Sequence, residues 1–198
     1  MATQGVATPW ANALGYTELV IISIWAIHAM AGAQKAGISV SKLDSACGWV
    51  EQCTSPYNGG VYYSLEATKT NVHRTGGSMS AFLYAGKSGS SKYSGFASYF
   101  KERFAEIPEG HSSAAMGYLN GALGSAAIGQ DQWDKFVSNF FENIISHQNG
   151  DGSFQAFDGE GKYGPGEFDG AAGPTYRTGL YVLILNLDMG NLYTLGGS

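Results

Sequence analysis

Oxygen-bearing side chains gather in one glycine-rich stretch of the chain, QNGDGSFQAFDGEGKYGPGEF. Four of them stand at positions 1, 3, 5 and 12 of the register that a helix-loop-helix calcium site uses: Asn149, Asp151, Ser153 and Glu160. Position 6 of such a loop is a glycine, because the chain turns sharply there, and this sequence has Phe154 instead. The spacing therefore argues against a regular calcium loop.

An irregular calcium site in the same region is a second hypothesis, since calcium accepts oxygen ligands in flexible geometry. Its candidate ligands are the carboxylates Asp151, Asp158, Glu160 and Asp169. The competing interpretation, which we favour, is a solvated turn that closes one helical hairpin onto the next. We therefore expect no cofactor, with calcium as the one alternative.

Two cysteines, Cys47 and Cys53, lie six residues apart near the end of a predicted helix. At this spacing they could form a disulfide, and a pair of buried free thiols is the alternative. Together with His73 they could also form a soft metal site, although buried thiols or a disulfide explain them more simply.

Composition excludes some classes of partner. The formal net charge is −5 and the chain has no basic run, so we expect no binding to nucleic acid. The longest apolar run, residues 19–33, is shorter than the roughly 20 residues that span a bilayer, so we expect no membrane-spanning helix. Charged residues make up only 14% of the chain and there are 12 tyrosines, which favours an extracellular or cell-surface protein.

The chain of 198 residues is expected to form one all-α domain over residues 1–198, with about seven helices and no strand. Apolar residues on every side of the predicted helix at 16–36 indicate a helix buried nearly all round. Two segments then recur in the same order. Gln52 and Gln148 each end a predicted helix before a glycine turn, and Arg74 and Arg177 each stand in the sequence Arg-Thr-Gly. This order indicates helical-hairpin repeats.

The glutamine and glycine endings have a physical role. A glutamine at a helix C-terminus can donate to carbonyls that lack intrahelical partners, glycine permits the reversal of the chain, and an aromatic residue packs beside the turn. We predict such a clamp in two places. Its residues are Gln148, Gly152 and Phe154 in the later repeat, and Gln52, Gly60 and Tyr62 in the earlier one.

This ending is similar to the glutamine-tryptophan motif of squalene and hopene cyclases and of protein prenyltransferase β-subunits. The chain most resembles bacterial prenyltransferase/squalene-oxidase repeat proteins, in stretches such as WVEQC, HSSAAMGYLNGAL, ISHQNGDGSF and GPTYRTGLYVLILNL that run in the same order over most of residues 15–195. The resemblance implies an α/α toroid, in which inner helices line a central cavity and outer helices surround them. A closed toroid of that family needs more helices than the roughly seven expected here, so the resemblance implies an open or incomplete ring.

Catalytic residues of the family have no counterpart here. The cyclases use an acidic D-x-D-D segment, which this sequence lacks, and the prenyltransferases use an Asp-x-Cys zinc pair, whereas Asp44 and Cys47 are three apart. Whether the chain is an enzyme stays open, with a preference against it. The leading hypothesis is a non-catalytic structural or interaction module that forms a homo-oligomer, an extended assembly, or a complex with a related toroid half. The alternative is an enzyme or carrier for an isoprenoid-like apolar molecule in the toroid cavity.

Overall fold

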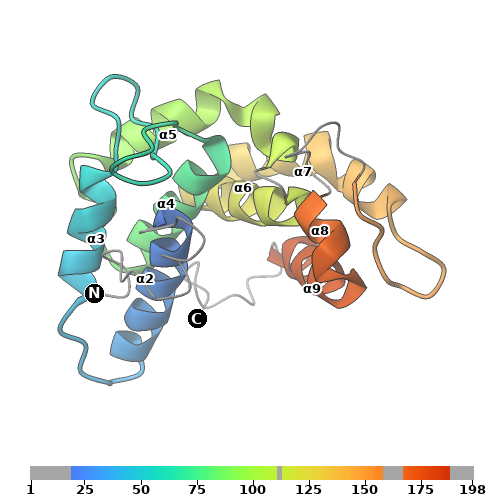
Figure 1. Ribbon diagram of the computed structural model, residues 1–198, viewed down its shortest axis with the longest axis horizontal. Helices are drawn as coiled ribbons and strands as arrows, with labels where there is room; N and C mark the ends of the chain where they lie inside the picture. Colours follow the sequence, from blue (N-terminus) through green and yellow to red (C-terminus); the bar gives the residue numbers. More distant parts are fainter. Residues whose placement is uncertain (1–18, 111–112, 158–166, 188–198) are drawn as a thin grey trace.

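The structure, a computed structural model, describes residues 19–110, 113–157 and 167–187 (Figure 1). Within these ranges the chain is helical and contains no β-strand, as the sequence predicts, and only isolated β-bridges join the turns. The helices are α2 (Val20–Lys35), α3 (Leu43–Gln52), α4 (Val72–Tyr84), α5 (Tyr93–Glu102), the 3-10 helix η1 (Phe104–Glu109), α6 (Ala114–Ile128), α7 (Gln130–Ser146), α8 (Glu167–Ala172) and α9 (Pro174–Leu185).

The helices form an inner row and an outer row. Helix α4 packs against α6 at the centre of the inner row, α2 packs on the free side of α4, and α9 packs on the free side of α6. In the outer row, α3 packs on α2, α5 on α4 and α7 on α6. The whole arrangement is curved, with α3, α5 and α7 on the convex side (Figure 1). Each outer helix follows its inner partner directly in the sequence, so the unit of the fold is a helical hairpin.

Glycine allows the two central helices to approach closely. A Cβ atom added at Gly124 on α6 would lie 2.6 Å from the Cα of Gly76 on α4, closer than two carbon atoms can pack. The fully buried ring of Phe100 lies beside this contact. Helices α4 and α6 therefore act as the core of the molecule.

Side-chain caps begin both central helices. The Oδ1 of Asn71 accepts hydrogen bonds from the amides of His73 and Arg74 at the start of α4. The hydroxyl of Ser113 accepts one from the amide of Met116 at the start of α6. Such caps satisfy amides that have no intrahelical acceptor, so the sequence itself fixes where these helices begin.

Helix α2 departs from its prediction. The sequence suggests burial on nearly all sides, but Ile22 is 55% exposed and Ala29 is exposed as well. The reason is position, because α2 stands at one end of the inner row and has α4 on one side only. Among the described residues, no helix combines the length and the hydropathy needed to cross a bilayer.

Candidate functional site

The turn after α7 contains the three predicted clamp residues Gln148, Gly152 and Phe154. Gln148 and Phe154 pair as an isolated antiparallel bridge, and Gln148 Nε2 donates to the carbonyl of Gly152 at 3.2 Å. Gly152 has φ of +86°, a conformation that favours glycine. The three residues that the sequence grouped as a clamp thus lie in one turn, but the donation of Gln148 is to a carbonyl of the turn and not to one at the end of α7.

Helix α9 holds this turn in place. The amide of Phe154 donates to Thr178 Oγ1 at 3.1 Å, and its carbonyl accepts from Arg177 Nε at 3.0 Å. The Phe154 ring is fully buried and lies 5.1 Å, between ring centroids, from Tyr181. Arg177 also donates through Nη1 to the carbonyl of Asp169 at 2.5 Å. The turn is therefore fastened to α9 by both its backbone and its aromatic side chain.

The same contact recurs at the turn after α3. Thr54 and Val61 form the isolated bridge, and the amide of Val61 donates to Thr75 Oγ1 at 3.0 Å, as Phe154 does to Thr178. Thr75 follows Arg74 as Thr178 follows Arg177, so the two Arg-Thr-Gly sequences occupy corresponding places in the two repeats.

In this earlier turn, the residues that form the contact are not those that the sequence comparison of the two repeats predicts. Gln52 is the last residue of α3 and is exposed, Gly60 is buried beneath the Tyr99 ring, and Tyr62 pairs with Thr70. Thr54 and Val61 thus stand where Gln148 and Phe154 stand in the later repeat. The reason is where the helices end: α3 ends at Gln52 and α7 at Ser146, so Thr54 and Gln148 each lie two residues after their helix.

Two of the four candidate calcium ligands lie in the described part of the chain, and each has other partners. Asp151 is exposed and accepts hydrogen bonds from the amide and hydroxyl of Ser153. Asp169 is fully buried, and its carboxylate accepts from Ser113 Oγ at 2.6 Å and from the amide of Ala115 at 2.9 Å. Burial raises the pKa of Asp169, and these hydrogen bonds offset part of that rise.

The other two candidate ligands, Asp158 and Glu160, lie outside the described residues. Within the described ranges, no group of three or more His, Cys, Asp or Glu side chains is placed to hold a metal ion. The irregular calcium site therefore stays a prediction about the loop that contains Asp158 and Glu160.

Cys47 and Cys53 are not joined in this structure, so the disulfide that their spacing would allow is not formed. Cys47 lies on the buried face of α3, and Cys53 is fully buried at its end. Burial raises the pKa of Cys47 to about 11, since the thiolate would lose its hydration.

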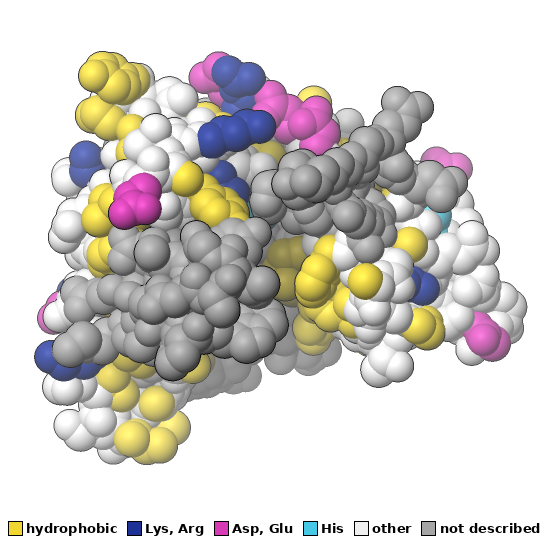
Figure 2. Space-filling model, viewed as in Figure 1, with side chains coloured by type: hydrophobic (Ala, Val, Ile, Leu, Met, Phe, Trp, Pro, Cys, Tyr) yellow, Lys and Arg dark blue, Asp and Glu magenta, His cyan; other side chains and the backbone are white. Residues whose placement is uncertain are grey.

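An apolar pocket of about 400 Å³ lies on the inner row, the side on which the toroid resemblance implies a cavity. It is lined by Trp25 and His28 from α2, Met116, Leu119 and Leu123 from α6, and Leu180 and Leu183 from α9. In the space-filling view, hydrophobic side chains gather on the side of α9 that faces the middle of the molecule (Figure 2). The sequence does indicate α2 and α6 as unusually apolar helices, but their common pocket depends on how they pack.

His28 is the polar member of the lining. Its Nε2 lies 3.1 Å from the hydroxyl of Ser80, and that hydroxyl donates to the carbonyl of Gly77, so Nε2 carries the proton and donates to Ser80. Nδ1 is buried and has no hydrogen-bond partner within the described ranges. Burial lowers the pKa of His28 to about 4, so the imidazole is neutral at pH 7.

Comparisons of the chain with protein-family models, with curated proteins and with solved structures gave no match. Function must therefore be argued from the geometry of the helices themselves.

Proposed function

We propose that this chain is a non-catalytic repeat module, an open segment of an α/α toroid, that assembles with further copies of itself through the end helices α2 and α9. Three features support the toroid interpretation. Inner and outer helices alternate along the chain, the molecule is curved, and the turns after α3 and α7 are fastened in the same way to the inner helices that follow.

The observation that carries the proposal is the apolar surface at both ends of the inner row. On α2, the residues Ile22, Ala26, Ala29 and Ala33 repeat at helical spacing along one partly or fully exposed stripe. On α9, Val182 is 48% exposed. Covering one such large side chain contributes about 1.5 to 3 kcal/mol, which favours association of the two ends.

The two faces suit each other in charge and in size. The α2 stripe carries no charged residue, and its alanines permit a second helix to approach closely. The exposed side of α9, formed by Thr175, Gly179 and Val182, is uncharged as well. A contact between α2 of one copy and α9 of the next would repeat the packing that already joins neighbouring inner helices. A related toroid half could occupy the same faces.

The oligomeric state tests this proposal. Light scattering across a range of concentrations is expected to show association of the natural chain. Ile22→Glu and Val182→Glu are each expected to raise the dissociation constant of the oligomer at least tenfold, because each places a charge in the contact between copies. Ile145→Glu is the matched control, since Ile145 is 51% exposed but lies on the outer helix α7. A compact monomer at every concentration would overturn the proposal, and so would an equal effect of the control.

The apolar pocket favours a second candidate function, carriage of an isoprenoid-like apolar molecule. Its volume of about 400 Å³ falls in the range of small-molecule sites. Its lining offers hydrocarbon on almost every side, together with the unpartnered Nδ1 of His28, which can accept a hydrogen bond from a ligand hydroxyl. A long-chain isoprenoid alcohol fits this chemistry.

Binding of farnesol, measured by quenching of tryptophan fluorescence, tests the second candidate, because Trp25 lines the pocket. Met116→Trp is expected to fill the pocket and abolish saturable binding. Val137→Trp, on the outer helix α7, provides a control with the same new fluorophore outside the pocket. Equal binding by both variants would place the ligand elsewhere and contradict the assignment.

A further inference from the structure

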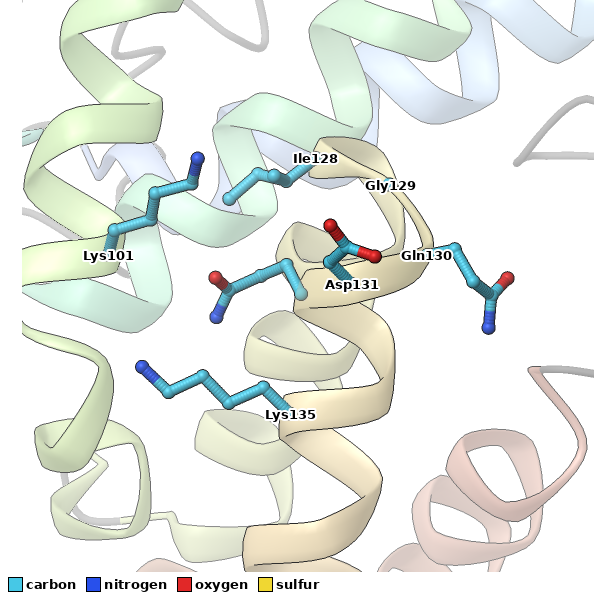
Figure 3. Close-up of a pocket in the computed structure, with 7 residues that line it drawn as sticks. Lys101, Ile128, Gly129, Gln130, Asp131 and Lys135 are labelled. Carbon is cyan, nitrogen blue, oxygen red and sulfur yellow. The ribbon is translucent and has the colours of Figure 1, made fainter.

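A polar pocket of about 560 Å³ lies at the N-terminus of α7, on the outer row and apart from the apolar pocket. It is lined by Lys101, Ile128, Gly129, Gln130, Asp131, Gln132 and Lys135. The side chains of Lys101 and Lys135 lie on one side of the α7 N-terminus, and that of Gln130 points to the opposite side (Figure 3).

The N-terminus of α7 has no side-chain cap. The residue before the helix is Gly129, which has no side chain to accept a hydrogen bond, and α7 runs for 17 residues beyond it. The amides of Gln132 and Trp133 donate to the carbonyl of Gly129, whereas those of Gln130 and Asp131 precede the first intrahelical bond. These amides and the helix dipole give the pocket a partial positive charge.

Two ammonium groups add full positive charge. Lys101 comes from the last turn of α5 and Lys135 from the second turn of α7, and both side chains are exposed. Neither forms an ion pair with another described residue, although Lys135 Nζ lies 4.7 Å from the centroid of the Phe104 ring. The carboxylate of Asp131 opposes them, which leaves the lining with a net positive charge.

Gln132 provides an independent indication of a ligand. Its side chain is only 8% exposed, and its Nε2 has no hydrogen-bond acceptor in the described part of the chain. Buried amide donors are nearly always paired, because an unpaired donor loses its hydration without compensation. An acceptor held in the pocket that Gln132 lines would supply this partner.

We propose that this pocket binds a phosphate group. Backbone amides, two ammonium groups and one carboxamide offer donors from several directions, which suits a group with three or more acceptor oxygens better than a planar carboxylate. The site is independent of the proposed self-association, because none of its residues belongs to the end helices α2 and α9.

Titration with inorganic phosphate at constant ionic strength, against chloride, tests the site. Saturable shifts are expected in the NMR amide signals of Gln130, Asp131 and Gln132. Lys101→Gln and Lys135→Gln are each expected to raise the dissociation constant about tenfold, since each removes a charge-assisted hydrogen bond. Asp131→Asn is expected to lower it, because the opposing charge is removed. A variant that loses its fold can only bind more weakly, so the opposite effects of the lysine and Asp131 substitutions on the dissociation constant distinguish specific binding from unfolding.

Lys42→Gln is the matched control, since Lys42 is an exposed lysine at the start of α3 and does not line the pocket. Absence of saturable shifts would overturn the proposal, as would equal weakening by Lys42→Gln. A second titration with phosphoserine identifies the source of the group. If phosphoserine binds more tightly than inorganic phosphate, the natural ligand is a phosphate group carried by a larger molecule. If it binds more weakly, the natural ligand is the free ion, bound at the same site.

Discussion

The carboxylate of Asp169 accepts a hydrogen bond of 2.6 Å from the hydroxyl of Ser113, although the two residues belong to different hairpins. Asp169 lies on α8, and Ser113 caps α6 at the centre of the fold. The second carboxylate oxygen accepts from the amide of Ala115, so a fully buried aspartate closes the N-terminus of α6 from outside its own hairpin. This contact joins α8, which packs on α9, to the core.

Asp169→Ala is expected to lower the free energy of unfolding by about 3 kcal/mol, because two buried donors on α6 lose a charged acceptor. Urea denaturation followed by circular dichroism measures the loss. Ser113→Ala keeps the bond from the amide of Ala115 but also removes the cap on the amide of Met116, so a loss of similar size is expected. If Asp169→Ala had no more effect than an exposed substitution such as Glu142→Ala, the capping role would be wrong.

Both threonine contacts are expected to stabilise the protein, and Thr75 more strongly, because its hydroxyl also donates to the carbonyl of Asn71 at 2.8 Å. Thr75→Val and Thr178→Val each remove the acceptor of one turn amide, with loss of about 1 to 3 kcal/mol in the free energy of unfolding. Valine keeps the shape of the side chain, so the change reports on the hydrogen bond. Thr175→Val, exposed on α9, serves as the control and should be nearly neutral. A neutral effect of either Thr75→Val or Thr178→Val would argue against corresponding contacts in the two repeats.

Two glycine substitutions are expected to act in opposite directions. Gly124→Ala should destabilise the protein by about 1 to 3 kcal/mol, because its Cβ would meet the backbone of Gly76 and force α4 and α6 apart. Gly48→Ala, inside α3 with open space around it, should stabilise by up to about 1 kcal/mol through helix propensity. Thermal denaturation of both variants measures the effects. Stabilisation by Gly124→Ala would show that the central helices are not in close contact.

Stability should fall in acid because of His28. Its pKa is near 6.5 when unfolded and about 4 in the folded protein, so the unfolded state binds the proton more readily. The contribution is complete above pH 6.5 and is lost as the pH falls towards 4, with a loss of about 2 kcal/mol by pH 5. Urea midpoints at pH 7.5 and pH 5 should differ less in His28→Leu than in the natural chain. An unchanged difference would contradict the assignment.

The thiols of Cys47 and Cys53 should resist alkylation in the folded protein, because both are buried and the pKa of Cys47 is raised to about 11. In the absence of reductant, iodoacetamide is expected to label both thiols after the protein is unfolded in urea, and neither thiol in the folded protein. Intact mass spectrometry counts the added groups. Failure to label either thiol after unfolding, with labelling restored by reductant, would show that the two cysteines form a disulfide.

Local sequence patterns determined much of the fold. Apolar periodicity predicted an all-helical chain, and the glutamine and glycine endings predicted where α3 and α7 turn. The recurrence of Arg-Thr-Gly marked Arg74 and Arg177 as corresponding residues, whose neighbouring threonines bind the two turns alike. These features are readable because helix formation and turning depend on residues close together in the chain.

Tertiary packing decided what local pattern could not. The contact after α3 lies at Thr54 and Val61 and not at Gln52 and Tyr62, and the hydrogen bond from Val61 to Thr75 fixes that register. The capping of α6 by Asp169 and the grouping of Trp25, Met116 and Leu180 around one pocket join segments far apart in the sequence. The exposed side of α2 could not be predicted from its sequence either. An apolar helix can have the same composition in the middle of a row as at its end, and only its neighbours determine which side is exposed.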